Sequence, residues 1–254
     1  MNATGYIYDG SFEGLLTCIY EAYYRHENPS FISSSKKYSE SIKGTLFQLL
    51  DSPLRIETDM SKSGKVYSAV ENKISSDALE TIYNVFLSEV PGFEIMTLDY
   101  VRLGFKTGYD LNKLLQDKRV MDMIKTERKV IFEVHRMHGF LRFQERPGFY
   151  YAPCEPDHNI TALMTPHFAQ RLPDQDFIIH DVRRGIASVC RRAEWFITSM
   201  EGAVKEAVLR GEGDAYEDLW KGYFSWATID ERKNPKNQKR QMPKRYWKHL
   251  TEFE

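Results

Sequence analysis

Basic and aromatic side chains are concentrated near the end of the chain, in residues 232–249. This segment has eight lysines and arginines, no acidic residue, and the adjacent rings of Tyr246 and Trp247. Basic side chains neutralise phosphates and release counterions, and flat rings stack on unpaired bases. The pattern predicts contact with nucleic acid, and the alternative is a solvated tail whose two rings dock on the core. The residues expected to make the contact are Lys239, Arg240, Lys244, Arg245 and Tyr246.

The two rings are expected to differ in burial. Proline is favoured in the first turn of a helix, so a helix is predicted to begin at Pro243 and to run to about Phe253. Neighbouring residues of a helix point about 100° apart. Trp247 shares a face with Leu250 three residues later, so Trp247 is expected to be buried and Tyr246 to lie on the basic side.

Two histidines, His135 and His138, are three residues apart in a predicted helix. At this spacing they share a face and could bind a metal or transfer protons. A metal needs a third ligand, and Glu133 points to another side of the helix. His167 or Asp157 could supply that ligand, but the sequence alone does not bring them together. The alternative is one packing and one surface histidine, so we expect no resident metal or cofactor.

Acidic residues and histidines also occur together at Glu155–His158. Such pairs can transfer protons, although turn and capping roles are more common before a helix. The weak catalytic candidates are His135, His138, Glu155 and Asp157.

Four arginines of the second half are expected either to line one phosphate-binding surface or to pair with carboxylates. They are Arg142, Arg171, Arg183 and Arg184, and the first two are counted among the expected nucleic-acid contacts.

Composition excludes several classes of protein. The 254 residues are 42% hydrophobic and 13% aromatic with a net charge of −1, which indicates a folded chain with at most a local basic patch. Its three cysteines are far apart, so neither a disulfide framework nor an iron–sulfur site is expected. No signal peptide, membrane-length apolar run or glycine-rich phosphate loop is recognisable, and we expect a cytoplasmic protein with no membrane association.

The first half of the chain is predicted to be mostly helical. A short strand at Gly5–Asp9 precedes a helix from Phe12 to about His26, capped by Ser11, with Tyr20 and Tyr23 on its apolar face. Residues 32–35 and 45–59 are ambiguous. Further helices are predicted at Lys65–Lys73, Asp77–Val90, Ile95–Lys106 and Lys118–His138.

The second half changes period. A hairpin of Phe140–Gln144 and Tyr150–Pro153 is followed by a helix that Asn159 is expected to cap and that runs to about Arg171, although Pro166 could interrupt it. An antiparallel meander is predicted next, and then a helical C-terminal tail. The meander strands are Phe177–Asp181, Ile186–Arg191 and Trp195–Thr198, and the tail begins with Ala203–Arg210 and Tyr216–Ile229. This order predicts the α+β class. The whole chain reads as one family domain, with possible sub-units at residues 1–117 and 118–254.

Four blocks of sequence together resemble a known family. They are Tyr8–Tyr24, Glu133–Phe143, Ala152–Arg171 and Asn234–Phe253, of which the first block and the ending MPKRYW are specific in combination. The chain resembles the bacterial family of probable DNA-metabolism proteins, a domain of otherwise unknown function. The same domain occurs fused to a uracil-DNA-glycosylase-like domain, and separate members are linked to a radical-SAM protein of DNA repair or modification.

The resemblance implies a role in DNA metabolism but names no reaction and no catalytic residue. The last block ends at Phe253, so the glycosylase activity is not expected of this chain. Two hypotheses follow: a non-catalytic DNA-binding or adaptor subunit for a radical-SAM partner, or an enzyme that acts on a base or nucleotide with the histidines and acids above.

Overall fold

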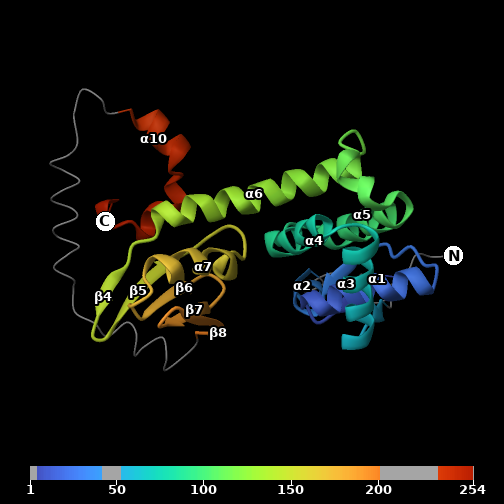
Figure 1. Cartoon of the computed structure of the whole chain (residues 1–254), viewed down its shortest axis with the longest axis horizontal. Coiled ribbons are helices and arrows are strands. Elements are labelled where there is room, and N and C mark those ends of the chain that lie inside the picture. The colour runs from blue at the N-terminus through green and yellow to red at the C-terminus, as the bar shows by residue number, and fades with distance from the viewer. Residues whose placement is uncertain (1–4, 42–52, 201–233, 254) are drawn as a thin grey trace. The chain divides into compact units, whose positions relative to one another are not determined.

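The chain forms two compact units, which the computed structural model describes over residues 5–41, 53–200 and 234–253 (Figure 1). Unit 1 is Met1–Val130 and unit 2 is Ile131–Glu254. The division falls inside the long helix α6 (Lys118–Phe140), whereas the sequence suggested a division before that helix. Each unit combines helices with a sheet, which confirms the α+β class.

Unit 1 contains a small parallel sheet with strand order β2-β1-β3. The strands are β1 (Tyr6–Tyr8), β2 (Ile32–Ser34) and β3 (Leu54–Arg55). The predicted first strand is confirmed as β1, and the two ambiguous regions supply the others, although residues 45–52 lie outside the described part. Strands of two or three residues carry too little alternation for a sequence pattern to reveal them.

Helix α1 (Phe12–Tyr24) leaves β1 through a tight connection. The Ser11 hydroxyl accepts a hydrogen bond from the Gly14 N–H at 2.9 Å, which confirms the predicted cap. A Cβ at Gly14 would lie 2.3 Å from Asp9 Oδ1, so only glycine lets the helix start this close to the strand end. Tyr23 lies on the same side of the helix as Ile19 and Tyr20, as predicted, although it is 51% exposed.

The remaining helices of unit 1 follow closely on one another. They are α2 (Ser35–Ser41), α3 (Met60–Lys73), α4 (Ser76–Ser88), α5 (Phe93–Thr107) and the 3₁₀ turn η2 (Gly108–Lys113). Helix α3 begins at Met60 rather than Lys65 because the Asp59 carboxylate accepts from the N–H groups of the first turn. The Ser75 hydroxyl caps α4 by accepting from Ala78 N–H at 3.0 Å.

Unit 2 contains a five-stranded sheet of order β4-β5-β6-β7-β8. The strands are β4 (Gln144–Arg146), β5 (Phe149–Cys154), β6 (Phe177–Asp181), β7 (Ile186–Arg191) and β8 (Glu194–Ser199). The predicted hairpin (β4–β5) and meander (β6–β7–β8) are confirmed. A parallel β5–β6 pair, connected through α7 (Thr161–Arg171), joins them and was not predicted.

Two boundaries in unit 2 differ from the prediction. The first hairpin strand is not Phe140–Gln144, because α6 continues to Phe140 and β4 begins at Gln144. Gly148, at φ +87°, turns the chain between β4 and β5. Helix α7 has Ile160 and not Asn159 as its N-cap residue, and it continues through Pro166.

The described C-terminal segment, residues 234–253, is made of short helices. They are α10 (Pro235–Gln241), η4 (Lys244–His249) and η5 (Thr251–Phe253). The predicted single helix is therefore two 3₁₀ turns, and α10 was not predicted. The helices expected at residues 203–210 and 216–229 lie outside the described residues. Within the described part, no helix combines the length and the apolarity that crossing a membrane requires.

Candidate functional site

A buried carboxylate on α6 organises the C-terminal part of unit 2. The Glu133 side chain is 3% exposed and accepts three hydrogen bonds. Its Oε1 accepts from Asp157 N–H at 2.7 Å and from the Tyr246 hydroxyl at 2.5 Å, and its Oε2 accepts from His158 N–H at 2.9 Å. Hydrogen bonds to an ionised acceptor are the strong ones. One side chain thus fixes both the turn after β5 and the C-terminal segment.

Tyr246 is a buried docking residue of that segment. It is 4% exposed, and burial followed by the hydrogen bond to Glu133 raises the pKa of its hydroxyl. The Arg245 guanidinium lies 4.6 Å from the Tyr246 ring centroid and pairs with Asp157 Oδ2 at 2.8 Å. The ring is not open to a nucleobase, so the prediction that Tyr246 lies on the basic side is wrong.

Trp247 is half-buried rather than in the core. Its Nε1 donates to the Met242 carbonyl at 2.9 Å, and its ring stacks on Phe253 with centroids 4.2 Å apart. Leu250 is 1% exposed, but the Trp247 ring does not follow it into the core and packs on Phe253 instead.

Two further ion-paired contacts hold the segment. Lys248 and His249 both bind the Glu155 carboxylate, His249 through Nε2 at 3.2 Å, and the Lys248 hydrogen bond lowers the pKa of Glu155. Arg142 binds Glu252 in a two-pronged pair with N–O distances of 3.1 and 2.7 Å. This geometry is strong and planar, so Arg142 is used to dock the segment.

Of the other three arginines, one is paired within the fold and two are exposed. Arg184 pairs with the fully buried Asp181 at 2.8 Å and donates to the backbone carbonyls of Pro156 and Asp157. Arg171 and Arg183 are exposed. The four arginines therefore do not form one phosphate-binding surface, since two of them stabilise the fold.

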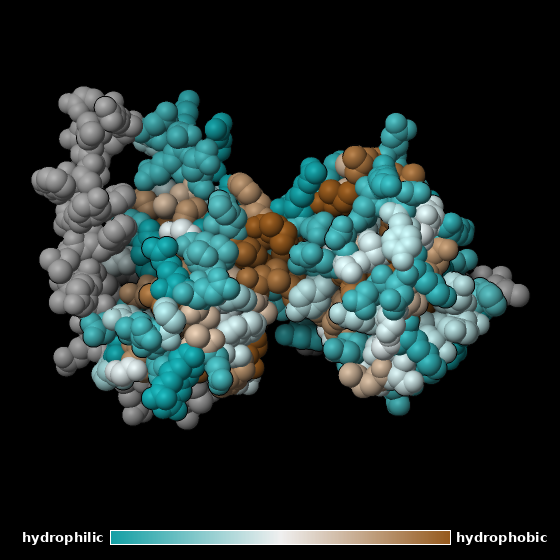
Figure 2. All heavy atoms as spheres, in the orientation of Figure 1, coloured by the Kyte–Doolittle hydropathy of each residue, from teal (hydrophilic) through white to brown (hydrophobic). Residues whose placement is uncertain are grey.

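Four exposed cations of the C-terminal segment have no carboxylate partner among the described residues, and we call them the C-terminal cation face. They are Lys236, Lys239, Arg240 and Lys244. The first three occur at i, i+3 and i+4 on α10, so they share a side of that helix. None of the four pairs with a carboxylate among residues 5–41, 53–200 and 234–253. Figure 2 shows the surface over α10 as hydrophilic.

The histidines do not assemble into a catalytic group with the acids. His135 is exposed, while the His138 ring stacks on His167 with centroids 4.1 Å apart. Burial, and then His167, lower the pKa of His138, which favours the neutral ring. Neither His135 nor His138 bonds to Glu155 or Asp157 within the described residues. Over that same part of the chain, no three metal-ligating side chains lie close enough to hold an ion.

Sequence reasoning missed the role of Glu133. It placed this residue correctly on a different side of the helix from the histidines. Its partners, however, lie 24, 25 and 113 positions away, so no local pattern could indicate them.

These contacts define an α+β protein whose basic C-terminal segment is held against the rest of unit 2 by ion pairs and by the Tyr246–Glu133 hydrogen bond. The family model for a domain of unknown function, DUF4130, matches residues 91–252, and the chain belongs to this family. No curated protein and no solved structure matches the chain.

Proposed function

We propose that this protein acts in DNA repair or modification as a non-catalytic subunit that binds DNA through the C-terminal cation face. The observation that carries the proposal is a set of exposed cations on α10 and Lys244 that lack carboxylate partners in the described structure. Phosphate groups supply the missing counter-charge. Arg171 is a secondary contact, because it is also exposed and also without a carboxylate partner in the described part.

The docking contacts explain why these cations remain available. Glu155, Asp157 and Glu252 are each paired with a basic side chain. These three carboxylates are therefore already neutralised by their basic partners. Helix α10 has no acidic residue of its own. A local positive surface follows on a chain whose net charge is −1.

The dispersal of the histidines and acids supports binding over an enzyme that would use them. In the proposed pair the radical-SAM partner holds the reactive cluster, and this chain supplies DNA contact. That partner comes from the family resemblance, and its test is co-expression of the two proteins followed by size-exclusion chromatography with and without damaged DNA. Separate elution under both conditions would contradict the adaptor role.

DNA contact is tested by salt-dependent binding of a labelled duplex, followed by fluorescence anisotropy. We expect Lys239→Ala/Arg240→Ala to weaken binding alike for all sequences and to flatten the log–log salt slope by about 2, since each phosphate contact contributes about 0.9. The matched control is Lys113→Ala/Lys118→Ala, which removes the same charge from residues already paired with Asp110 and Asp122. An unchanged slope in the Lys239/Arg240 variant would overturn the proposal.

A further inference from the structure

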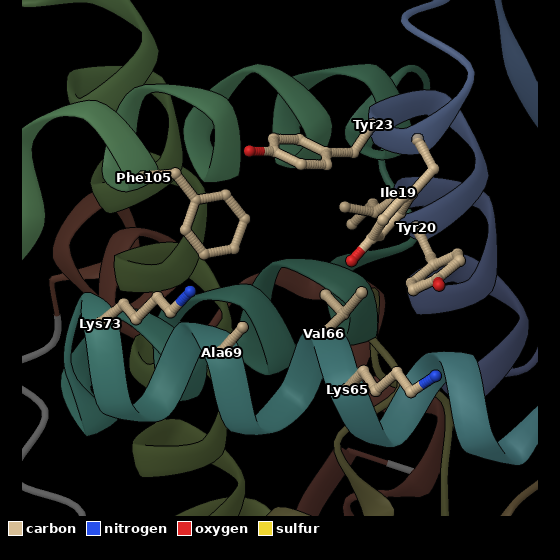
Figure 3. A pocket seen from close by; sticks show the side chains of 9 residues that line it. Ile19, Tyr20, Tyr23, Lys65, Val66, Ala69, Lys73 and Phe105 are labelled. Atoms are coloured by element: carbon tan, nitrogen blue, oxygen red, sulfur yellow. The ribbon is translucent and has the colours of Figure 1, made fainter.

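Unit 1 has a pocket of about 200 Å³ lined by aromatic rings and lysines (Figure 3). It lies between α1, α3 and α5. Tyr23 of α1 and Phe105 of α5 line one side of it and meet edge to face, with ring centroids 5.9 Å apart. Val66 and Ala69 of α3 lie between Lys65 and Lys73 along the pocket's edge.

The rings of this pocket are unusually exposed. Tyr23 and Tyr24 are 51% and 63% exposed, although each could bury a large apolar area. Tyr24 stacks on Tyr20 with centroids 4.2 Å apart, so these two rings are already aligned. A cluster of exposed aromatic side chains marks an interaction site more often than a packing fault.

The charged residues that line the pocket are two lysines. Lys65 and Lys73 are eight positions apart on α3, so they share its pocket-facing side, and both are exposed. Neither pairs with a carboxylate in the part of the chain that the structure describes. Lys62, one turn away, is different because it binds Glu21 at 2.7 Å. Open rings between two such cations suit a ligand with a flat ring and flanking negative charges.

We propose that this pocket binds an unpaired base of single-stranded DNA, with Lys65 and Lys73 contacting the phosphates on either side. A base in a duplex is stacked on both faces and cannot enter, whereas an unpaired base of any identity offers a face to a tyrosine. The proposal rests on the proposed function in that the protein meets DNA, but it uses residues of a different unit.

The first test is anisotropy with a labelled oligothymidylate and with a duplex of equal length. Tyr23→Leu/Tyr24→Leu keeps an apolar surface and removes the stacking faces, and Lys65→Ala/Lys73→Ala removes the cations. Each is expected to weaken single-strand binding at least about fivefold, with duplex binding changed less than about twofold. The matched controls are Tyr67→Leu, also exposed on α3 but outside the pocket lining, and Lys106→Ala on α5. The proposal would be overturned if both pocket variants melted like the wild type and bound single-stranded DNA with the wild-type affinity.

A second test separates this proposal from the proposed function. An oligonucleotide with 5-iodouracil is photo-crosslinked to the protein and the adduct is located by mass spectrometry. Adducts on Tyr23, Tyr24 or Phe105 support the pocket. Adducts confined to residues 234–253 overturn the pocket and leave the C-terminal cation face standing. If the pocket adducts persist in Lys239→Ala/Arg240→Ala and the duplex salt slope is unchanged in that variant, the C-terminal cation face is refuted while the pocket is supported.

Discussion

Replacing Tyr246 with phenylalanine removes one hydroxyl and tests whether Glu133 docks the C-terminal segment. The hydroxyl donates to Glu133 Oε1 at 2.5 Å, and Tyr246 is only 4% exposed. Phenylalanine keeps the buried ring and leaves the carboxylate with two of its three donors. A hydrogen bond to a charged group contributes about 1.5–3 kcal/mol. We therefore expect the free energy of unfolding of unit 2 to fall by about 2 kcal/mol.

Glu133→Gln is expected to cost more, about 3 kcal/mol or above. A neutral amide has one acceptor oxygen, and its NH₂ group must face a backbone N–H or the Tyr246 hydroxyl. The buried donors of Asp157 and His158 cannot both be satisfied by that single oxygen. Glu133→Gln costs more because it sets an NH₂ group against a buried backbone N–H and removes the charge from the hydrogen bonds that remain, whereas Tyr246→Phe only deletes the bonds of the hydroxyl itself.

The assay is urea denaturation followed by tryptophan fluorescence. All four tryptophans of the chain lie in unit 2, so the signal reports that unit alone. The matched control is Tyr150→Phe, which deletes the hydroxyl of a half-buried tyrosine of the same unit that makes no hydrogen bond to the described residues, and its expected cost is below about 0.5 kcal/mol. A Tyr246→Phe variant as stable as the control would refute the reasoning, because a hydroxyl that holds a buried carboxylate cannot be removed without cost.

Three further outcomes are expected. Arg142→Ala should lower the free energy of unfolding by about 2–3 kcal/mol, because it removes a two-pronged ion pair whose side chains are only 20% and 2% exposed. Arg191→Ala removes a pair that is 79% and 39% exposed, so it should cost less than about 1 kcal/mol in the same urea titration. Burial raises the pKa of Tyr151 from 10.0 to about 12, so the unfolded chain loses this proton first and the free energy of unfolding falls as the pH rises above about 10. The melting temperature of Tyr151→Phe should therefore decline less steeply with pH than that of the wild type, and an equal decline would contradict this assignment. The three cysteines are buried, and burial raises the pKa of each thiol. Ellman's reagent should therefore react slowly with the native protein and titrate three thiols after unfolding, and rapid labelling of the native chain would contradict the described burial.

Elements with strong local patterns could be predicted closely from the sequence. The strands Phe177–Asp181 and Ile186–Arg191 have the predicted bounds, because alternation and flanking turn residues are properties of neighbouring positions. The cap at Ser11 is equally local, since a hydroxyl reaches an N–H three residues on. The α+β class follows from the order of such elements.

The sequence also determined where the basic residues gather, but tertiary contacts decided which of them remain available. Lys239, Arg240, Arg245 and Lys248 read alike in the sequence, yet the last two are paired with carboxylates about 90 positions away. The same holds for the rings: the Tyr246 hydroxyl reaches the buried Glu133, 113 residues earlier, whereas the Trp247 Nε1 bonds to the Met242 carbonyl only five positions away. Composition and spacing fix what a side chain can bond to, whereas burial and pairing depend on groups that only the folded chain brings within about 3 Å.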